Sequence, residues 1–427
     1  MALLVAVYFA SKSIARIRRN INLGKDLKIE GNKAERIKKM VLIAFGQKKM
    51  FDRPIPALLH LVIYVGFLIV NIEMLEIVID GLLGTHRVFL PVLGSLYPFL
   101  INVFEVFAFG VILVCVVFLL RRNVLNIQRF KSPELKKWPF LDANLILVFE
   151  IVLMWAFLNM NAIDQLLQSR GEAHYPPTGN FLISQFFIPL YSNAGDFGLV
   201  FAERFYWWFH ILGVFAFANY LPHSKHLHII LAFPNTYFSR LEPAGKIQNM
   251  PVVTAEVKSM LGMESDSNNQ NTENLRFGAK DVNDLSWKNI LEAYTCTECG
   301  RCSSVCPANL TGKKLSPRKV MMDTRDRAEE IGKLMDSKSD WQSTQPLYSE
   351  KYISKEELLA CTTCNACVDA CPVNISPLEI IVELRRFMVM EESKSPASWN
   401  AMFSNLETNF SPWKFSTNDR FNWSEKA

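Results

Sequence analysis

The second half of this chain is built around two similar cysteine runs, CTECGRCSSVCP at residues 296–307 and CTTCNACVDACP at residues 361–372. Each reads C-x-x-C-x-x-C-x-x-x-C-P. A loop with this spacing supplies three of the four thiolates that hold a [4Fe–4S] cube, and the cysteine before the proline ligates the neighbouring cube. We therefore predict two clusters. The first is held by Cys296, Cys299, Cys302 and Cys371, and the second by Cys361, Cys364, Cys367 and Cys306.

Structural zinc and disulfide bonds are the alternatives for these cysteines. Zinc takes four ligands rather than eight in two C-P runs, and disulfides are typical of small secreted domains. Both fit this chain less well than two cubes. The remaining cysteine, Cys115, stands alone in an apolar run and is predicted to be a small core residue.

The first half of the chain is apolar enough to cross a membrane. Each of its long apolar runs reaches the ~20 residues that a spanning helix needs, and we expect spans at 57–80, 97–120, 143–167 and 202–222. The run at 2–9 is too short to span alone and is interpreted as the tail of a first helix. The run at 181–191 is interpreted as re-entrant or interfacial. The predicted fold is all-α: a polytopic transmembrane helix bundle followed by a mostly α-helical bis-[4Fe–4S] ferredoxin domain.

Composition divides the chain into four parts: a bundle at 1–235, a linker at 236–283, a dicluster domain at 284–392 and an aromatic tail at 393–427 that docks a partner. Lysine and arginine are concentrated at 11–56 and 121–139. By the positive-inside rule these basic loops are cytoplasmic. We therefore expect a multi-pass protein of the bacterial inner membrane with its cluster domain in the cytoplasm. No motif predicts a nucleic-acid partner.

Histidine placement in the membrane half predicts haem. His60 lies near the cytoplasmic end of its helix, and His210 and His228 are 18 residues apart, which is five turns or roughly 27 Å of regular helix. His60 and His228 then share one depth, and we predict that they are the axial ligands of a b-type haem. A second haem requires His210 to meet His86, folded back from the outer loop. The alternative is a hydrogen-bonded core role for His210.

Other polar residues of this half have two interpretations each. His223 and His226 can form a metal site with His228 or lie at the interface, where Lys225 is available to a haem propionate. The acids of the predicted spans form a proton path to a quinone or make hydrogen bonds between helices, and we favour the second. These acids are Glu73, Glu76 and Asp80, on one stripe that points away from His60, with Glu105 and Glu150.

The run HILGVFAFANYLPHSKHLH (210–228) gives the membrane half a resemblance to the gamma subunit of respiratory nitrate reductases. That family is a five-helix b-type cytochrome that oxidises quinol. The resemblance implies that His228 pairs with His60 at the cytoplasm-side haem. It places the partner of His210 at the position of Val70, where this chain departs from the family.

The cysteine runs and their flanks resemble heterodisulfide-reductase-related proteins, including complexes associated with dissimilatory sulfite reduction. The resemblance rests on DLSWKNILEAYTCTECGRCSSVCPA, TGKKLSPRKVMMDTRD and LLACTTCNACVDACPVNISP, within about 280–390. The tail SNLETNFSPWKFSTNDRFNW resembles the family's linker into cysteine-rich CCG domains, and this chain has no Cys-Cys pair. The resemblance implies a catalytic module on a separate polypeptide that docks on Trp413, Phe415 and Trp423.

Together these features predict a membrane-anchored electron-transfer subunit of an oxidoreductase in a respiratory chain. Electrons pass between membrane quinone, haem b, the two clusters and a cytoplasmic heterodisulfide-reductase-like partner. The alternative is a membrane ferredoxin that acts in metal-cofactor assembly or redox sensing. A nucleotide-dependent dehydrogenase is disfavoured because the chain lacks a GxGxxG fingerprint.

Overall fold

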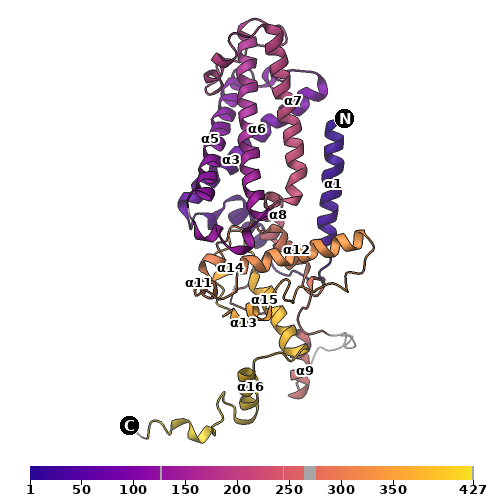
Figure 1. The fold of residues 1–427 in the computed structure, drawn as a ribbon, viewed down its shortest axis with the longest axis vertical. Coiled ribbons are helices and arrows are strands. Elements are labelled where there is room, and N and C mark those ends of the chain that lie inside the picture. The colour runs from indigo at the N-terminus through magenta and orange to yellow at the C-terminus, as the bar shows by residue number, and fades with distance from the viewer. Residues whose placement is uncertain (126, 244, 264–275, 426–427) are drawn as a thin grey trace.

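The computed structural model describes residues 1–125, 127–243, 245–263 and 276–425. Within these ranges the regular elements are helices, with isolated bridges but no β-strand. The predicted all-α fold is therefore confirmed. Figure 1 shows a bundle of long helices above a compact domain of shorter helices, from which the C-terminal segment extends downward.

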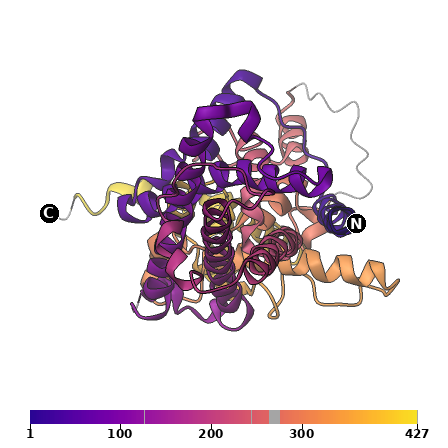
Figure 2. The same ribbon diagram turned by 90° about the horizontal axis from the view of Figure 1, so that it is seen from above.

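Four long helices form the bundle: α3 (Pro54–Leu83), α5 (Tyr97–Asn123), α6 (Trp138–Ser169) and α7 (Asp196–Tyr220). α6 packs against both α5 and α7, and α3 packs against α5. Glycines allow this close approach, because a Cβ at Gly66 would lie 2.9 Å from Val111 and one at Gly213 would lie 2.6 Å from Leu153. Figure 2 shows these helices from above.

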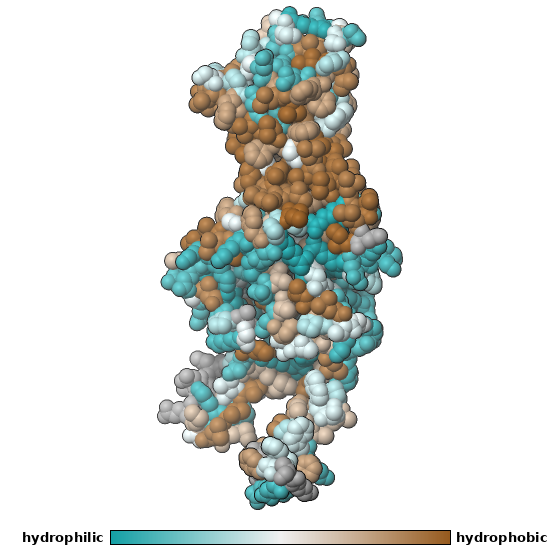
Figure 3. All heavy atoms as spheres, turned by 90° about the vertical axis from the view of Figure 1, so that its left-hand side faces the viewer, coloured by the Kyte–Doolittle hydropathy of each residue, from teal (hydrophilic) through white to brown (hydrophobic). Residues whose placement is uncertain are grey.

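Three segments of the described chain are long and apolar enough to cross a membrane: Pro54–Leu83, Leu90–Asn123 and Trp138–Ser169. They confirm three of the four predicted spans. The fourth run does form a helix, α7, but it is less apolar because of Glu203, Arg204 and its tyrosine and tryptophan side chains. Figure 3 shows the apolar surface as a band around the bundle on the visible face, with hydrophilic surface above and below it.

The apolar run at 2–9 begins α1 (Ala2–Ile21), a 20-residue helix whose last turns are basic. α1 lies beside α7 and its C-terminal part packs on the cluster domain (Figure 1). There Arg19 donates to the carbonyl of Gly332 at 3.0 Å, and the Asn20 amide donates to the Tyr294 hydroxyl at 3.0 Å. The N-terminal segment therefore contacts both halves of the molecule.

The regular helix predicted between His210 and His228 is not formed. α7 ends at Tyr220 and is followed by two short 3₁₀ turns, η8 (Leu221–His223) and η9 (Lys225–Leu227). Between them Ser224 is extended, with φ −125° and ψ 155°. A new helix, α8 (His228–Tyr237), starts at the histidine itself. The prediction of five uninterrupted turns is therefore wrong, because the chain changes direction at Ser224.

The run at 181–191 forms two more 3₁₀ turns, η6 (Ser184–Phe186) and η7 (Ile188–Leu190), which lie against α6. The carboxylate of Glu105 on α5 accepts the backbone N–H of Ile183 at 2.8 Å. The segment is therefore fixed to the bundle by a buried acid.

The cluster domain has one continuous apolar core. Its main helices are α10 (Trp287–Thr295), α12 (Pro317–Asp336), α13 (Lys355–Ala360) and α15 (Pro377–Arg386). α10 and α13 begin with capping boxes, Ser286 with Asn289 and Ser354 with Glu357. Each helix then ends at the first cysteine of a run, so the two runs start from equivalent short, capped helices.

The predicted linker and tail are only partly described. Residues 244, 264–275 and 426–427 lie outside the described residues, and the rest of the linker contains α9 (Pro251–Met260). The tail contains α16 (Ala397–Asn409), which projects away from the domain (Figure 1). The aromatic side chains named for docking, Trp413, Phe415 and Trp423, are all exposed.

Candidate iron–sulfur and haem centre

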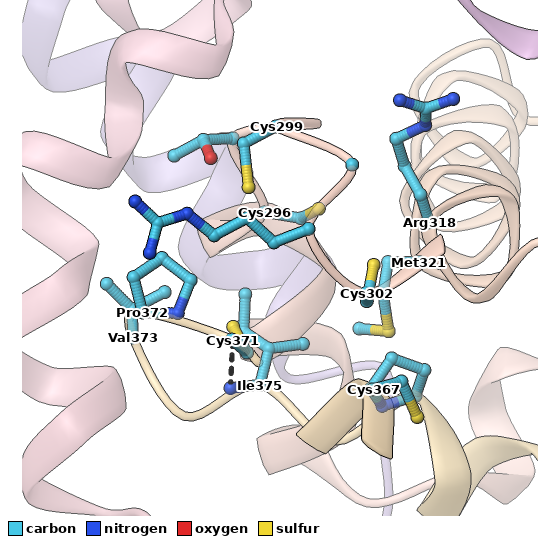
Figure 4. A pocket seen from close by; sticks show the side chains of 14 residues that line it. Cys296, Cys299, Cys302, Arg318, Met321, Cys367, Cys371, Pro372, Val373 and Ile375 are labelled. Atoms are coloured by element: carbon cyan, nitrogen blue, oxygen red, sulfur yellow. Dashed lines mark hydrogen bonds between the residues drawn. The ribbon is translucent and has the colours of Figure 1, made fainter. Parts of the chain in front are cut away.

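The two cysteine runs meet around a small cavity between their loops (Figure 4). Its lining includes Cys296, Cys299 and Cys302 of the first run together with Cys367 and Cys371 of the second. All of these except Cys367 are predicted to share the first cube. The cysteine before the second proline has thus crossed to the loop of the first run, which fits the predicted ligand set.

The other four cysteines also lie close together. Burial, together with the neighbouring thiols of Cys361, Cys306 and Cys364, raises the pKa of Cys367 to about 12. Cys306, which precedes the first proline, therefore lies beside the second loop. Within the described chain no three histidine, cysteine or acidic side chains are close enough to ligate a single metal ion. The possible site of His223, His226 and His228 is therefore not formed.

Both loops turn in the same way. Glu298 and Gly300 in the first run have φ of 56° and 72°, and Thr363 and Asn365 at the equivalent positions of the second have 55° and 62°. Such left-handed residues bend the chain back on itself, and glycine and asparagine tolerate this conformation best. Gly300 is also needed for space, because a Cβ there would lie 2.4 Å from the guanidinium of Arg318.

Backbone amides point at two of the thiols. The N–H of Thr363 donates to Cys361 Sγ at 3.4 Å, and that of Ile375 donates to Cys371 Sγ at 3.3 Å (Figure 4). Hydrogen bonds to cysteine sulfur favour the ionised form that metal ligation requires, and they tune the potential of an iron–sulfur cluster.

His60 and His228 meet at the end of the bundle that faces the cluster domain. Their ring centroids are 6.5 Å apart. A histidine nitrogen binds a metal at about 2 Å and the ring centre lies roughly 1 Å behind it, so two axial imidazoles on one iron are roughly 6 Å apart. Nδ1 of His60 is 3.1 Å from Gln47 Oε1, and Nδ1 of His228 is 3.0 Å from the Lys225 carbonyl. Nδ1 contacts of this kind leave Nε2 for a metal, so both histidines fit a haem.

The structure does not bring His210 and His86 together. His210 Nδ1 contacts the carbonyl of Leu153 at 2.9 Å, whereas His86 Nε2 lies 3.3 Å from Asp164. Leu153 and Asp164 are eleven residues apart on α6, or roughly 16 Å along the axis. The predicted pairing for a second haem is therefore not formed. The contact of His210 fits its alternative role as a hydrogen-bonded core residue.

Lys225 points toward the first cysteine loop. Its Nζ donates to Glu298 Oε2 at 2.6 Å and to the Pro139 carbonyl at 2.8 Å. Burial alone would raise the pKa of Glu298, but Lys225 and Arg325 outweigh it and hold that pKa below its usual range. The described contacts thus give Lys225 a role in joining the two halves, and its contact with a haem propionate stays a prediction.

The acids of the spans mostly belong to a hydrogen-bond network around a buried arginine that sequence reasoning missed. Arg87 donates to Glu73 at 3.1 Å and to Asp164 at 2.7 Å, and its backbone N–H donates to Asp80 at 2.8 Å. Glu76 accepts the Tyr97 hydroxyl at 2.7 Å. These contacts support the structural interpretation of the acids. The available signal was Arg87 itself, which is the lone basic residue of the connection at 84–97.

Basic residues at the junction were also missed. Arg318 is fully buried, and it donates to the Glu134 carboxylate and the Arg129 carbonyl, both at 2.8 Å. Arg301 donates to the carbonyl of Lys49 at 3.1 Å. Membrane loops thus cover the first cysteine run. The signal was present in the sequence as arginines inside and just after the cysteine motif.

These features define a membrane-associated iron–sulfur protein. The chain matches the 4Fe-4S dicluster domain family over residues 295–375. It is 27% identical over its whole length to a protein of Bacillus subtilis named probable iron-sulfur-binding oxidoreductase FadF, covering 59% of that protein. It is 26% identical over 91% of its length to the EtfAB:quinone oxidoreductase of Syntrophomonas wolfei, covering 54% of it. The chain thus spans between a half and three-fifths of these curated relatives.

The likeness to heterodisulfide reductase is also found. One component of the dihydromethanophenazine:CoB–CoM heterodisulfide reductase of Methanosarcina mazei is 28% identical over 148 residues, which are 34% of this chain and 35% of that component. No solved structure matches this chain. The similarities support an electron-transfer oxidoreductase with a dicluster domain. The likeness to the nitrate reductase gamma subunit stays a prediction.

Proposed function

We propose that this chain passes electrons between a membrane quinone and a cytoplasmic redox partner through a haem b and two [4Fe–4S] clusters. One observation carries the proposal: the cysteine loops contact the segment that holds a haem-site histidine. Gln47 contacts His60, and two residues later Lys49 Nζ donates to Asn374 Oδ1 at 3.1 Å, next to the second cysteine run. The proposed haem site and the proposed cluster sites are therefore neighbours along one electron-transfer path.

The ligand sets are those expected from the sequence. The first cluster takes Cys296, Cys299, Cys302 and Cys371, the second takes Cys361, Cys364, Cys367 and Cys306, and the haem iron takes His60 and His228. When bound, these groups supply one-electron transfer. The residues of this chain hold the spacing, orient the imidazoles through Gln47 and the Lys225 carbonyl, and keep water from the first loop.

The two clusters have different surroundings. In the first loop Glu298 and Arg301 are buried, whereas Cys364 of the second loop is exposed. We therefore propose that the first cluster faces the haem and the second faces the partner. Charge in the basic loops supports a cytoplasmic location of this side, in the inner membrane of a bacterium.

The relatives support both a membrane substrate and a redox partner for the proposed electron-transfer path. The name of the S. wolfei relative supports quinone as the membrane substrate and EtfAB as a redox partner. The heterodisulfide-reductase likeness supports a CCG-domain module beside the exposed tail of Trp413, Phe415 and Trp423. Because the curated relatives are longer than this chain, such a module is proposed as either a separate polypeptide or a further part of a longer one.

The test is optical and magnetic spectroscopy of the purified chain in detergent. We expect a haem α-band after dithionite reduction and electron paramagnetic resonance (EPR) signals from two clusters. H60A and H228A should each abolish the α-band and stop reduction of the clusters by a short-chain quinol, while dithionite still reduces them. H210A, at a buried histidine with its own hydrogen bond, is the matched control and should keep both properties. A wild-type chain with clusters but no α-band would refute electron transfer through a haem b. It would favour a membrane ferredoxin for cofactor assembly or sensing.

A further inference from the structure

Positive side chains gather around the first cysteine loop from both halves of the molecule. Arg301 lines the cavity with cysteines of both runs and donates to the carbonyl of Lys49. Arg129 comes from the loop between α5 and α6, and its carbonyl lies 3.5 Å from where a Cβ of Gly300 would be. Arg53 donates to Ser304 Oγ at 3.0 Å.

Arg129 is the unusual member of this group. Its Nε and Nη1 atoms are buried and have no hydrogen-bond partner in the described chain, and no described carboxylate forms an ion pair with it. Burial, together with Arg53, Arg121 and Arg301, lowers the pKa of Arg129 to about 10, and Cys299 is the negative group that acts against this. The guanidinium is partly buried, and its Cζ lies 4.9 Å from the centroid of the Phe130 ring. A partly buried guanidinium among like charges is unfavourable unless an anion lies beside it.

A cube with four thiolate ligands is such an anion, and one-electron reduction increases its negative charge. Nearby cations therefore stabilise its reduced state. We propose that Arg129, Arg301 and Lys49 form a cationic shell that raises the reduction potential of the first cluster above that of the second. This inference rests on the proposed ligand sets. Two members of the cationic shell, Lys49 and Arg129, belong to the membrane half, so contact between the halves sets the potential.

The second cluster lacks an equivalent set of cations in the described chain. Arg385 approaches it, donating to the carbonyls of Leu358 at 2.8 Å and of Cys361. Cys364 is exposed, and water and salt weaken the effect of charges at an exposed site. With both clusters bound, this order of potentials would favour transfer of one electron from the site of Cys361, Cys364, Cys367 and Cys306 to the site of Cys296, Cys299, Cys302 and Cys371. No bond is formed or broken, and no proton is transferred.

The test is a potentiometric titration followed by EPR on the full chain. C299S and C364S first assign the signals, because each alters a ligand of one cluster. R129Q should then lower the reduced-to-oxidised ratio of the first cluster by about tenfold at fixed potential, or 59 mV for one electron, and leave the second unchanged. R129K should keep the wild-type value because it keeps the charge. K136Q removes a charge from an exposed position in the same loop and should change neither cluster.

R385Q should lower the reduction potential of the second cluster and leave that of the first unchanged. Equal potentials in R129Q and wild type, or equal shifts in R129Q and K136Q, would overturn the cationic shell. If R129Q does not assemble its clusters, K49Q replaces it. K49Q should also lower the potential of the first cluster, and an unchanged first cluster would refute the cationic shell. A wild-type chain without two [4Fe–4S] signals would instead refute the proposed function, which keeps the two failures distinct.

Discussion

Replacement of Lys225 by methionine should loosen the first cysteine loop from the membrane half. The Lys225–Glu298 pair is 2.6 Å long, and the two side chains are only 11% and 2% exposed. Breaking a buried pair costs about 3–5 kcal/mol. Glu298 keeps Arg325 at 2.9 Å in the variant, so we expect a smaller loss of about 2–3 kcal/mol. At 1.4 kcal/mol per factor of ten, this is about a 30- to 150-fold increase in local opening.

Hydrogen–deuterium exchange of the backbone amides at 296–302 measures this opening directly. K314M is the matched control, because Lys314 forms a bridge of similar length with Glu356 in which both side chains are more than half exposed. Its exchange should equal that of wild type. Since the pKa of Glu298 is held low, its stabilising effect is present above the ordinary glutamate pKa of about 4.3 and is lost as the pH falls below that value. Unchanged exchange in K225M at neutral pH would refute the coupling of the two halves through this pair.

Three further perturbations test other parts of the structure. R87M leaves Glu73 and Asp164 without their buried cation and should cost about 3–5 kcal/mol of stability, measured as a lower thermal midpoint in detergent. R170M removes an exposed ion pair and should change the midpoint little. Equal midpoints in the two variants would contradict the network around Arg87. G278A places a Cβ 2.3 Å from the Glu383 carbonyl and should reduce the content of acid-labile sulfide. G312A has a φ of +80° but open space around the new Cβ, and should not reduce it. Equal effects would mean that backbone strain, rather than the steric contact, decides the loss of sulfide. C306S should alter the EPR signal of the second cluster and C371S that of the first, and the reverse result would reject the crossed ligand sets.

The cysteine sets, which stay a prediction, follow from the sequence because the cofactor, not the fold, fixes their spacing. A cube demands four thiolates at set separations, so the order of cysteines along the chain already determines which loops must meet. The structure adds how the chain meets this demand, through left-handed residues at equivalent positions of both runs. Neither the turn geometry nor the cover provided by Arg318 and Glu134 follows from the motif, because both depend on contacts between distant segments.

The proximity of His60 and His228 was predicted from an incorrect geometry. The sequence argument assumed one regular helix, and Ser224 interrupts it. The two histidines nevertheless meet, because each lies near the start of a helix at the junction with the cluster domain. The partner of the buried acids could not be predicted from the sequence for a related reason. Arg87 and Asp164 are 77 residues apart, and only the folded bundle shows that they touch.

The position of the basic loops gives a physical reason for joining a membrane bundle to a cluster domain in one chain. By the positive-inside rule, the lysines and arginines in these loops are predicted to orient the helices with respect to the membrane. In the folded molecule the backbone carbonyls of Lys49 and Arg129, from the same loops, lie against Arg301 and Gly300 of the first cysteine loop, where nearby charge would change the energy of reduction of a bound cluster. A detached cluster domain would lose these two charges and expose the thiols to water, and both changes alter the potential. If the proposed function holds, residues that set membrane topology also belong to the redox site, and correct insertion of the bundle is a condition for a correctly tuned cluster.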